Sequence, residues 1–81
     1  MIEATAVASG PPNSRTAARN VRAELARADL SYKDAAQQLG LSYAAFRRRT
    51  DEEIDFRAGE LEALAQLLEI PLARLTEEPR P

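Results

Sequence analysis

The sequence lacks three residue types on which much protein chemistry depends: its 81 residues include no Cys, no His and no Trp, and the only aromatic side chains are two Tyr and two Phe. Without Cys there is no disulfide bond and no thiolate nucleophile, and without Cys and His the common zinc ligand sets are excluded. A chain this short has room for one domain with a small core. That domain must be stabilised by packing alone, which favours a compact helical bundle.

Long apolar runs are missing as well. No stretch of about 18 apolar residues exists that could span a bilayer. The first ten residues carry Glu3 but no Lys or Arg, so they lack the basic start of a signal peptide, and they also lack its strong apolar stretch. We therefore expect a cytoplasmic protein.

The motifs of common enzymes are also absent. The acidic residues between Asp51 and Asp55 form one hydrated run, which lacks the ordered oxygen spacing and the turn Gly of a divalent-ion loop. No phosphate-binding loop, Gly-rich dinucleotide turn or nucleophile elbow occurs. We expect a protein that is not an enzyme and that uses no cofactor, metal or small-molecule ligand.

Charge, by contrast, is plentiful and unevenly distributed. The net charge is −2, but residues 1–50 carry eight basic and four acidic side chains, a net +4, whereas residues 51–81 carry three basic and nine acidic ones, a net −6. Such asymmetry suggests one face for a polyanion and another that avoids it. The alternative is a charged, solvated surface with random clustering.

Composition shifts divide the chain into three parts. Residues 1–14 are small and polar, and because they contain Pro-Pro, which cannot enter a helix interior, we expect a flexible N-terminal arm in which Asn13 or Ser14 caps the following helix. Residues 77–81 are expected to form a C-terminal tail. The folded domain is predicted over residues 15–76.

Within the predicted domain, apolar residues recur at helical spacing. The pattern predicts an all-α fold of five short helices, over about 15–28, 32–39, 43–50 and 58–69, with a short fifth helix opened by Pro71. In the fifth helix, Leu72 and Leu75 are expected to point inward. No stretch alternates with period two for long enough to be a strand.

Residues 31–50 carry the most informative pattern. Ser31 and Ser42 are good N-caps, and Gly40 lies where a left-handed turn is easily made. The pair Ala35-Ala36 is small enough for two helices to approach closely. The angle between the helices can be filled by Leu39, Leu41 and Phe46. This arrangement predicts a helix-turn-helix, whose second helix enters the DNA major groove; the alternative is an ordinary corner between two helices.

A helical wheel of the third predicted helix separates the candidate DNA contacts. At about 100° per residue, Phe46 marks the inward face, and Ala44 and Arg48 lie nearly opposite it. Ala44 would let the helix approach the bases, and the Arg48 guanidinium has the geometry to bind guanine O6 and N7 together. Ser42 and Tyr43, at the helix start, can donate to phosphate or to base edges.

The neighbours of Arg48 occupy other positions on the wheel. Arg47 flanks the outward face, whereas Arg49 lies only about 60° from the inward one. We expect Arg49 to run along the edge of the core to a phosphate, or to pair with an acid such as Asp51 or Glu52. The alternative for all three arginines is a solvated face.

Strings spread over residues 20–72 match one known pattern: Asn20-Val21-Arg22-Ala23-Glu24-Leu25, Leu30-Ser31 leading to Ala35-Ala36, Leu39-Gly40-Leu41-Ser42, Phe56 with Glu60-Leu61, Leu64-Ala65, Leu68 and Ile70-Pro71-Leu72. On these residues the chain resembles the Cro/C1-type helix-turn-helix regulators, the lambda-repressor-like DNA-binding domains, and especially small repressors of actinobacterial phages and prophages. The resemblance implies a compact five-helix domain that binds double-stranded operator DNA. Its reader would be the helix at about 43–50, acting in a bacterial or phage-infected cell.

The resemblance also implies roles by position. It assigns base reading to Ser42, Tyr43, Ala44 and Arg48, and a flanking contact to Arg47. Tyr32 matches a phosphate-contacting position that is usually Gln, and Arg22 and Lys33 are further candidate phosphate contacts. Two departures concern the end of the third helix: Thr50 replaces an apolar residue, and Asp51-Glu52 replaces a common Asn-Gly turn.

Oligomeric state and partner stay open at this point. Many relatives bind palindromes as homodimers through the surface around the fourth and fifth helices, where Leu67 widens an apolar stripe; the alternative is that this stripe serves the single core. Two rival functions also stand. One is a protein-interaction module, antirepressor-like or antitoxin-like, that docks its acidic residues 51–62 on a basic surface. The other is a recombination directionality factor.

Overall fold

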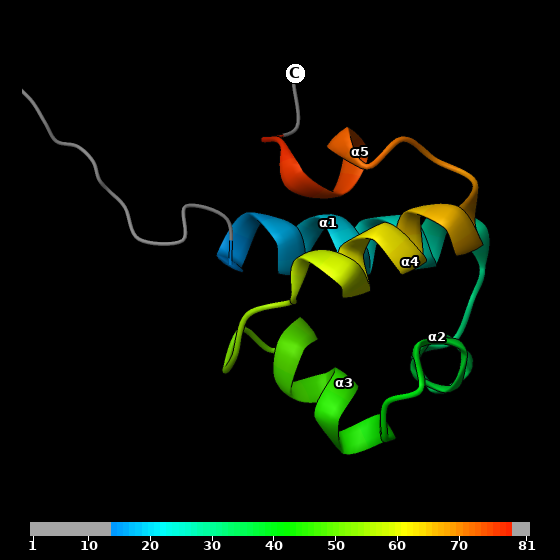
Figure 1. Cartoon of the computed structure of the whole chain (residues 1–81), viewed down its shortest axis with the longest axis vertical. Coiled ribbons are helices and arrows are strands. Elements are labelled where there is room, and N and C mark those ends of the chain that lie inside the picture. Colours follow the sequence, from blue (N-terminus) through cyan, green and yellow to red (C-terminus); the bar gives the residue numbers. More distant parts are fainter. Residues whose placement is uncertain (1–13, 79–81) are drawn as a thin grey trace, which may run out of the picture.

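The computed structural model describes residues 14–78, which fold into five helices with no strand among them (Figure 1). The helices are α1 (Ser14–Ala28), α2 (Tyr32–Leu39), α3 (Tyr43–Thr50), α4 (Ala58–Leu68) and α5 (Ala73–Thr76). The predicted all-α class is confirmed, and the bounds of the first four helices agree with prediction to within one residue. Ser14, expected in the arm, begins α1. The rest of the arm, Asn13 included, and residues 79–81 of the tail lie outside the described residues.

α1 is the central support of the fold. It packs against α3, α4 and α5, while α2 packs against α3 and α4. In Figure 1, α5 lies on one side of α1 and α4, and α2 and α3 lie on the opposite side. α3 is therefore held from behind by α1 and α2, and its other surface faces away from α5.

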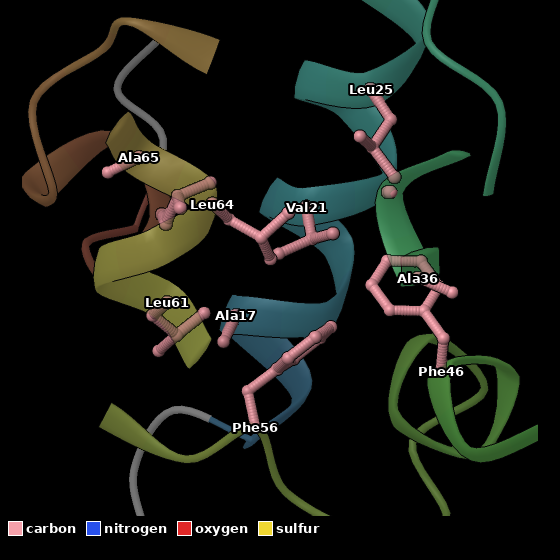
Figure 2. Packing of buried hydrophobic residues seen from close by; sticks show 11 residues of the cluster. Ala17, Val21, Leu25, Ala36, Phe46, Phe56, Leu61, Leu64 and Ala65 are labelled. Atoms are coloured by element: carbon pink, nitrogen blue, oxygen red, sulfur yellow. The ribbon is translucent and has the colours of Figure 1, made fainter. Parts of the chain in front are cut away.

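The core is one cluster to which every helix contributes (Figure 2). Its most deeply buried members are Val21 and Leu25 of α1, Ala35 of α2, Phe46 of α3, Leu64 of α4 and Leu75 of α5. The Phe46 ring meets Tyr32 and Phe56 edge-on, with ring centroids 5.8 Å apart in both pairs. This geometry is favourable for aromatic rings, so Phe46 fixes the inward face of α3 against α2 and against the loop before α4.

The predicted caps around α2 are confirmed. Ser31 Oγ accepts the N–H of Asp34, and Ser42 Oγ accepts the N–H of Ala45, each at 3.0 Å. Gly40 takes the predicted left-handed conformation, with φ of 73°, and the end of α2 is closed there by backbone hydrogen bonds.

Three further helix ends use the same left-handed turn without glycine. Asp29, Glu52 and Glu69 have φ values of 58°, 68° and 58°. In each case the next residue donates to the carbonyl five positions earlier, at 2.8–3.0 Å. This conformation costs a residue with a Cβ about 1–2 kcal/mol, so α1, α3 and α4 end on strained positions that the sequence pattern did not reveal.

The prediction for the fifth helix is confirmed for Leu75 and wrong for Leu72. Leu75 is fully buried, whereas Leu72 is 39% exposed. The helix begins at Ala73, two residues after Pro71. At helical spacing Leu72 lies about 60° from Leu75, and this offset turns it toward a shallow hollow beside α4 that it shares with Ile70.

The chain beyond α5 packs back onto α1. Asn20 Nδ2 donates to the Glu77 carbonyl at 2.8 Å, and the Thr16 hydroxyl donates to the Glu78 carboxylate. These contacts hold residues 77 and 78, the first two of the predicted tail, against the domain.

Candidate nucleic-acid interface

α2 and α3 form a helix-turn-helix unit around two small side chains. Ala35 and Ala36 are buried where α2 meets its neighbours, and the turn at Gly40 leads directly into α3. Leu39 and Leu41 are partly buried against the core and fill the angle between the helices. The alanine pair is therefore buried on a helix that packs against α3 and α4.

The outward face of α3 is arranged as the helical wheel predicts. Phe46 is fully buried, whereas Ala44 and Arg48 are exposed. Within residues 14–78, the Arg48 side chain takes part in no ion pair, although six other arginines do. Its guanidinium is therefore available to a ligand, and the small Ala44 beside it leaves room for one.

Ser42 and Tyr43 mark the N-terminus of α3. Because Ser42 Oγ accepts a hydrogen bond from the helix backbone, its own hydroxyl hydrogen remains free to donate. Tyr43 is 50% exposed. The free N–H groups of this first turn favour an anion in front of them.

Arg47 is held between two tyrosine rings and a carboxylate. Its guanidinium lies 5.6 Å from the Tyr32 ring and 5.9 Å from the Tyr43 ring. It donates to the Tyr43 hydroxyl at 3.1 Å and to Asp51 at 3.2 and 3.3 Å. These hydrogen bonds, first that to Tyr43 and then that to Asp51, raise the pKa of Arg47. Its Nε is buried and has no partner among the described residues.

Arg49 does not face a ligand. Its side chain is 10% exposed and that of Glu60 14%, and the guanidinium donates to the Glu60 carboxylate at 2.8 and 3.2 Å and to the Ala45 carbonyl at 2.8 Å. The sequence predicted either a phosphate contact or an ion pair for Arg49; the structure shows an ion pair, but the predicted partners, Asp51 and Glu52, are wrong. Because the donors of Arg49 are used inside the fold, the geometry does not support its assignment as a phosphate contact.

The ion pair fixes the charge of Glu60. Burial alone would raise the pKa of this carboxyl, but hydrogen bonds from Arg49 and from the N–H of Arg57, together with their positive charges, outweigh burial and lower the pKa below its ordinary value. Glu60 thus remains ionised and ties the last turn of α3 to the first turn of α4.

A hollow lies beside α3, at the start of α2. It is lined by Arg22, Ser31, Tyr32, Lys33, Tyr43, Arg47 and Asp51. The hollow therefore brings together four residues that the sequence assigned to phosphate or flanking contacts, and it combines three cations with the N-terminus of a helix. This combination suits a phosphate group.

The three cations of the hollow differ in whether they are already paired with other groups of the protein. Lys33 is exposed and forms no ion pair within residues 14–78. Arg22 donates to the Thr50 carbonyl and pairs with Glu52 at 3.5 Å. Arg47 pairs with Asp51, and this i,i+4 spacing is a signal that the sequence contains. No sequence pattern indicates the contact from Arg22, because it depends on how α1 packs on α3.

No family model and no curated protein matches the chain. Its structure is similar to the solution structure of the SOS-response transcriptional repressor LexA from Eubacterium rectale, with a TM-score of 0.75 and 20% sequence identity over 84% of this chain and 72% of that one. At 20% sequence identity, this structural similarity is evidence for the fold alone. The fold is a helix-turn-helix.

The departures from the family pattern at Thr50 and at Tyr32 have structural explanations. Thr50, in an apolar position, is fully buried, and its hydroxyl donates to the Arg47 carbonyl at 3.2 Å. Tyr32 replaces Gln at the start of α2, and its ring packs on Phe46 at the edge of the hollow. Both replacements thus keep the unit packed.

Neither a metal centre nor a membrane span occurs in the part of the chain that the structure describes. No group of His, Cys, Asp and Glu side chains there could hold a metal ion. The helices of that part are too short and too polar to cross a bilayer.

Proposed function

We propose that the protein is a sequence-specific, double-stranded-DNA-binding transcriptional regulator that reads the major groove with α3. The observation that carries the proposal is the exposed Arg48 on the outward face of a short helix whose opposite face is anchored by Phe46. The similarity in fold to a transcriptional repressor supports the same class of function. A helix of this size and exposure fits the major groove of B-form DNA.

Base reading is assigned to four residues of the exposed face, namely Ser42, Tyr43, Ala44 and Arg48. Arg48 would donate to guanine O6 and N7, and Ala44 would lie against a thymine methyl group. Ser42 and Tyr43 would donate to base edges or to the nearest phosphate.

Phosphate and flanking contacts are assigned to the residues of the hollow. Lys33 and Arg47 would meet a phosphate there, with Arg22 and Tyr32 at its border. Such contacts set the position of the protein on the duplex and carry no sequence information.

At a finer level, we propose a Cro/C1-type repressor of a phage or prophage, acting in the cytoplasm of a bacterial or phage-infected cell. The strings that resemble this family support the assignment. This proposal includes homodimerisation on DNA through α4 and α5. The exposed Leu72 beside Ile70 offers an apolar surface for the dimer contact. Sedimentation with and without a palindromic duplex tests this: a monomer in both conditions contradicts the dimer.

Selection from a pool of random duplex DNA tests the proposal as a whole. We expect enrichment of a short consensus that includes a guanine, and a palindromic consensus would also report dimerisation. The same sequence offered as a single strand is the control and should not be retained. If no duplex is retained even at low ionic strength, the proposal is wrong.

A protein-interaction module is the second candidate. It is favoured by Ile54, which is 42% exposed between the acidic residues Glu53 and Asp55 and could enter an apolar pocket on a basic partner. This function requires no duplex binding, so the selection experiment separates it from the first. A recombination directionality factor would bind duplex DNA as well, and only an assay of integration and excision distinguishes it.

A further inference from the structure

Two acidic residues directly after α3 are paired with arginines that surround it. Asp51 pairs with Arg47 at 3.2 Å. Glu52 pairs with Arg15 at 3.3 Å and with Arg22 at 3.5 Å. One dipeptide thus holds three guanidinium groups from α1 and α3, and two of them, Arg22 and Arg47, line the hollow proposed for a phosphate.

The backbone conformation at Glu52 directs its side chain toward Arg15 and Arg22. Its left-handed φ of 68° belongs to a turn in which the N–H of Glu52 donates to the Arg49 carbonyl and the N–H of Glu53 to the Arg48 carbonyl. In this turn the Glu52 side chain reaches back to α1. Glu53 and Asp55 belong to the same loop, are exposed, and form no ion pair within residues 14–78.

These ion pairs contribute little to folding. All five side chains are at least 30% exposed, and pairs between exposed side chains are weak. Their influence on a polyanion is larger. A free arginine gains a full contact when it meets a phosphate, whereas a paired one must first give up its carboxylate.

We infer that Asp51 and Glu52 are specificity-determining residues, because as internal counter-ions they keep Arg22 and Arg47 from binding phosphates of arbitrary sequence. The inference rests on the proposed function. On random DNA, affinity comes almost entirely from phosphate contacts, so paired arginines weaken it. On a preferred site, Arg48 holds α3 deep in the groove, the phosphate reaches the hollow, and it displaces the carboxylates at a small cost.

Neutral substitutions of the two acids test this inference. Asp51→Asn and Glu52→Gln keep the size of each side chain and remove its charge. We expect each to raise the affinity for a short random-sequence duplex roughly threefold to tenfold, and to steepen the salt dependence of log affinity by about one for each freed arginine. Affinity for the site obtained by selection should rise less, so the specificity ratio falls. Fluorescence anisotropy at several salt concentrations measures all of these quantities.

Matched controls lie in the same loop. Asp55→Asn and Glu53→Gln change the net charge equally but free no arginine, so they should leave the salt dependence unchanged. Equal effects in the two sets would show that overall charge acts alone and would overturn the inference, as would unchanged binding in all four variants. Urea denaturation shows whether each variant is folded. If only one of Asp51→Asn and Glu52→Gln folds, that variant alone still tests the inference.

A double-mutant cycle identifies the freed arginine. Arg47→Gln should weaken random-duplex binding little in the wild-type chain, but it should remove the gain of Asp51→Asn. Equal losses in both backgrounds would overturn the inference. If the wild-type chain binds no duplex at all, the proposed function itself fails. That outcome is distinct from a chain that binds DNA but does not respond to Asp51→Asn.

Discussion

Arg47, Arg48 and Arg49 are consecutive in the sequence, yet each has a different environment. Successive helical residues are separated by about 100°, so one arginine faces solvent, one lies at the border and one reaches the core. Arg48 is exposed and has no ion pair among the described residues, Arg47 lies against Tyr32 and Tyr43, and Arg49 is in the buried pair with Glu60. Substitution of each should therefore affect a different property of the protein.

Arg48→Ala should lower affinity for the preferred site by about 1–3 kcal/mol and relax specificity at one base pair, because a bidentate guanine contact is lost. The comparison variant is Lys33→Ala, which should weaken binding to all sequences alike. Both effects are measured by titrating the preferred duplex and its single-base variants. Equal losses from Arg48→Ala on every duplex would assign Arg48 to the phosphate backbone.

Glu60→Gln should destabilise the domain by about 2–4 kcal/mol at neutral pH, because the largely buried guanidinium of Arg49 loses its counter-charge. The pKa of Glu60 is lowered in the fold. Its contribution is therefore complete above the unfolded pKa, about 4.3, and is lost as the pH falls through the folded pKa. Urea denaturation at several pH values should show the difference between the two proteins shrinking at acid pH. Parallel stability curves would contradict this account.

Single residues were predictable where local geometry decides them. The outward position of Ala44 and Arg48 follows from helical spacing relative to Phe46. The partner of Arg49 did not follow, because Glu60 belongs to α4 and its position depends on how that helix packs. Asp51 was assigned to the wrong arginine, although its spacing of four residues matches Arg47.

At the scale of elements, the helix ends show the same contrast. Ser31, Gly40 and Ser42 are residue types with strong local preferences, so the turn between α2 and α3 was predictable. Glu52 and Glu69 carry no such signal, because glutamate rarely takes a left-handed conformation. Their conformation is imposed by packing of the apolar residues and by the backbone hydrogen bonds of the turn.

Glu69→Gly should stabilise the domain by about 0.5–1 kcal/mol. Glycine adopts a positive φ without a Cβ clash, and this gain outweighs the larger backbone entropy that glycine loses on folding. Glu69 is exposed and forms no ion pair within residues 14–78, so no contact is lost with it. Glu69→Ala is the control and should bring no gain, since alanine keeps the Cβ. The urea midpoints of the two variants decide the question. A gain of the same size with alanine would refute strain at this turn.

The converse change concerns the turn of the helix-turn-helix unit. Gly40→Ala should destabilise the domain by about 1 kcal/mol. A Cβ at Gly40 would meet no atom within 4 Å, so the cost is that of the positive φ alone. Gly59→Ala is the control, because it also meets nothing but lies inside α4 at an ordinary helical φ. It should stabilise α4 slightly. Thermal unfolding compares the two, and losses of equal size would contradict the argument.

At the scale of the whole molecule, the fold places one group of acidic residues outside the hollow proposed for a phosphate. The candidate phosphate contacts come from α1, α2 and α3, whereas Glu62 belongs to α4, Glu69 directly follows α4, and Glu77 and Glu78 follow α5. α5 lies on the side of α1 and α4 opposite to α3 (Figure 1). A chain with a net charge of −2 can thus present cations to DNA, because these four acids lie outside the hollow and the acids beside α3, Asp51 and Glu52, are paired with arginines.

This separation predicts a strong salt dependence in spite of the negative net charge. With four to six phosphate contacts, the logarithm of the affinity for a duplex should fall against the logarithm of the salt concentration with a slope of about −4 to −5. Lys33→Ala should make the slope shallower by about one, since one phosphate contact is lost. Glu69→Gln, which changes the net charge by one unit in the opposite direction outside the hollow, should leave the slope unchanged, because the slope reports the number of phosphate contacts. A flat response to salt would mean that the basic face does not meet phosphates, and the acidic, Ile54-bearing loop would then become the surface to study.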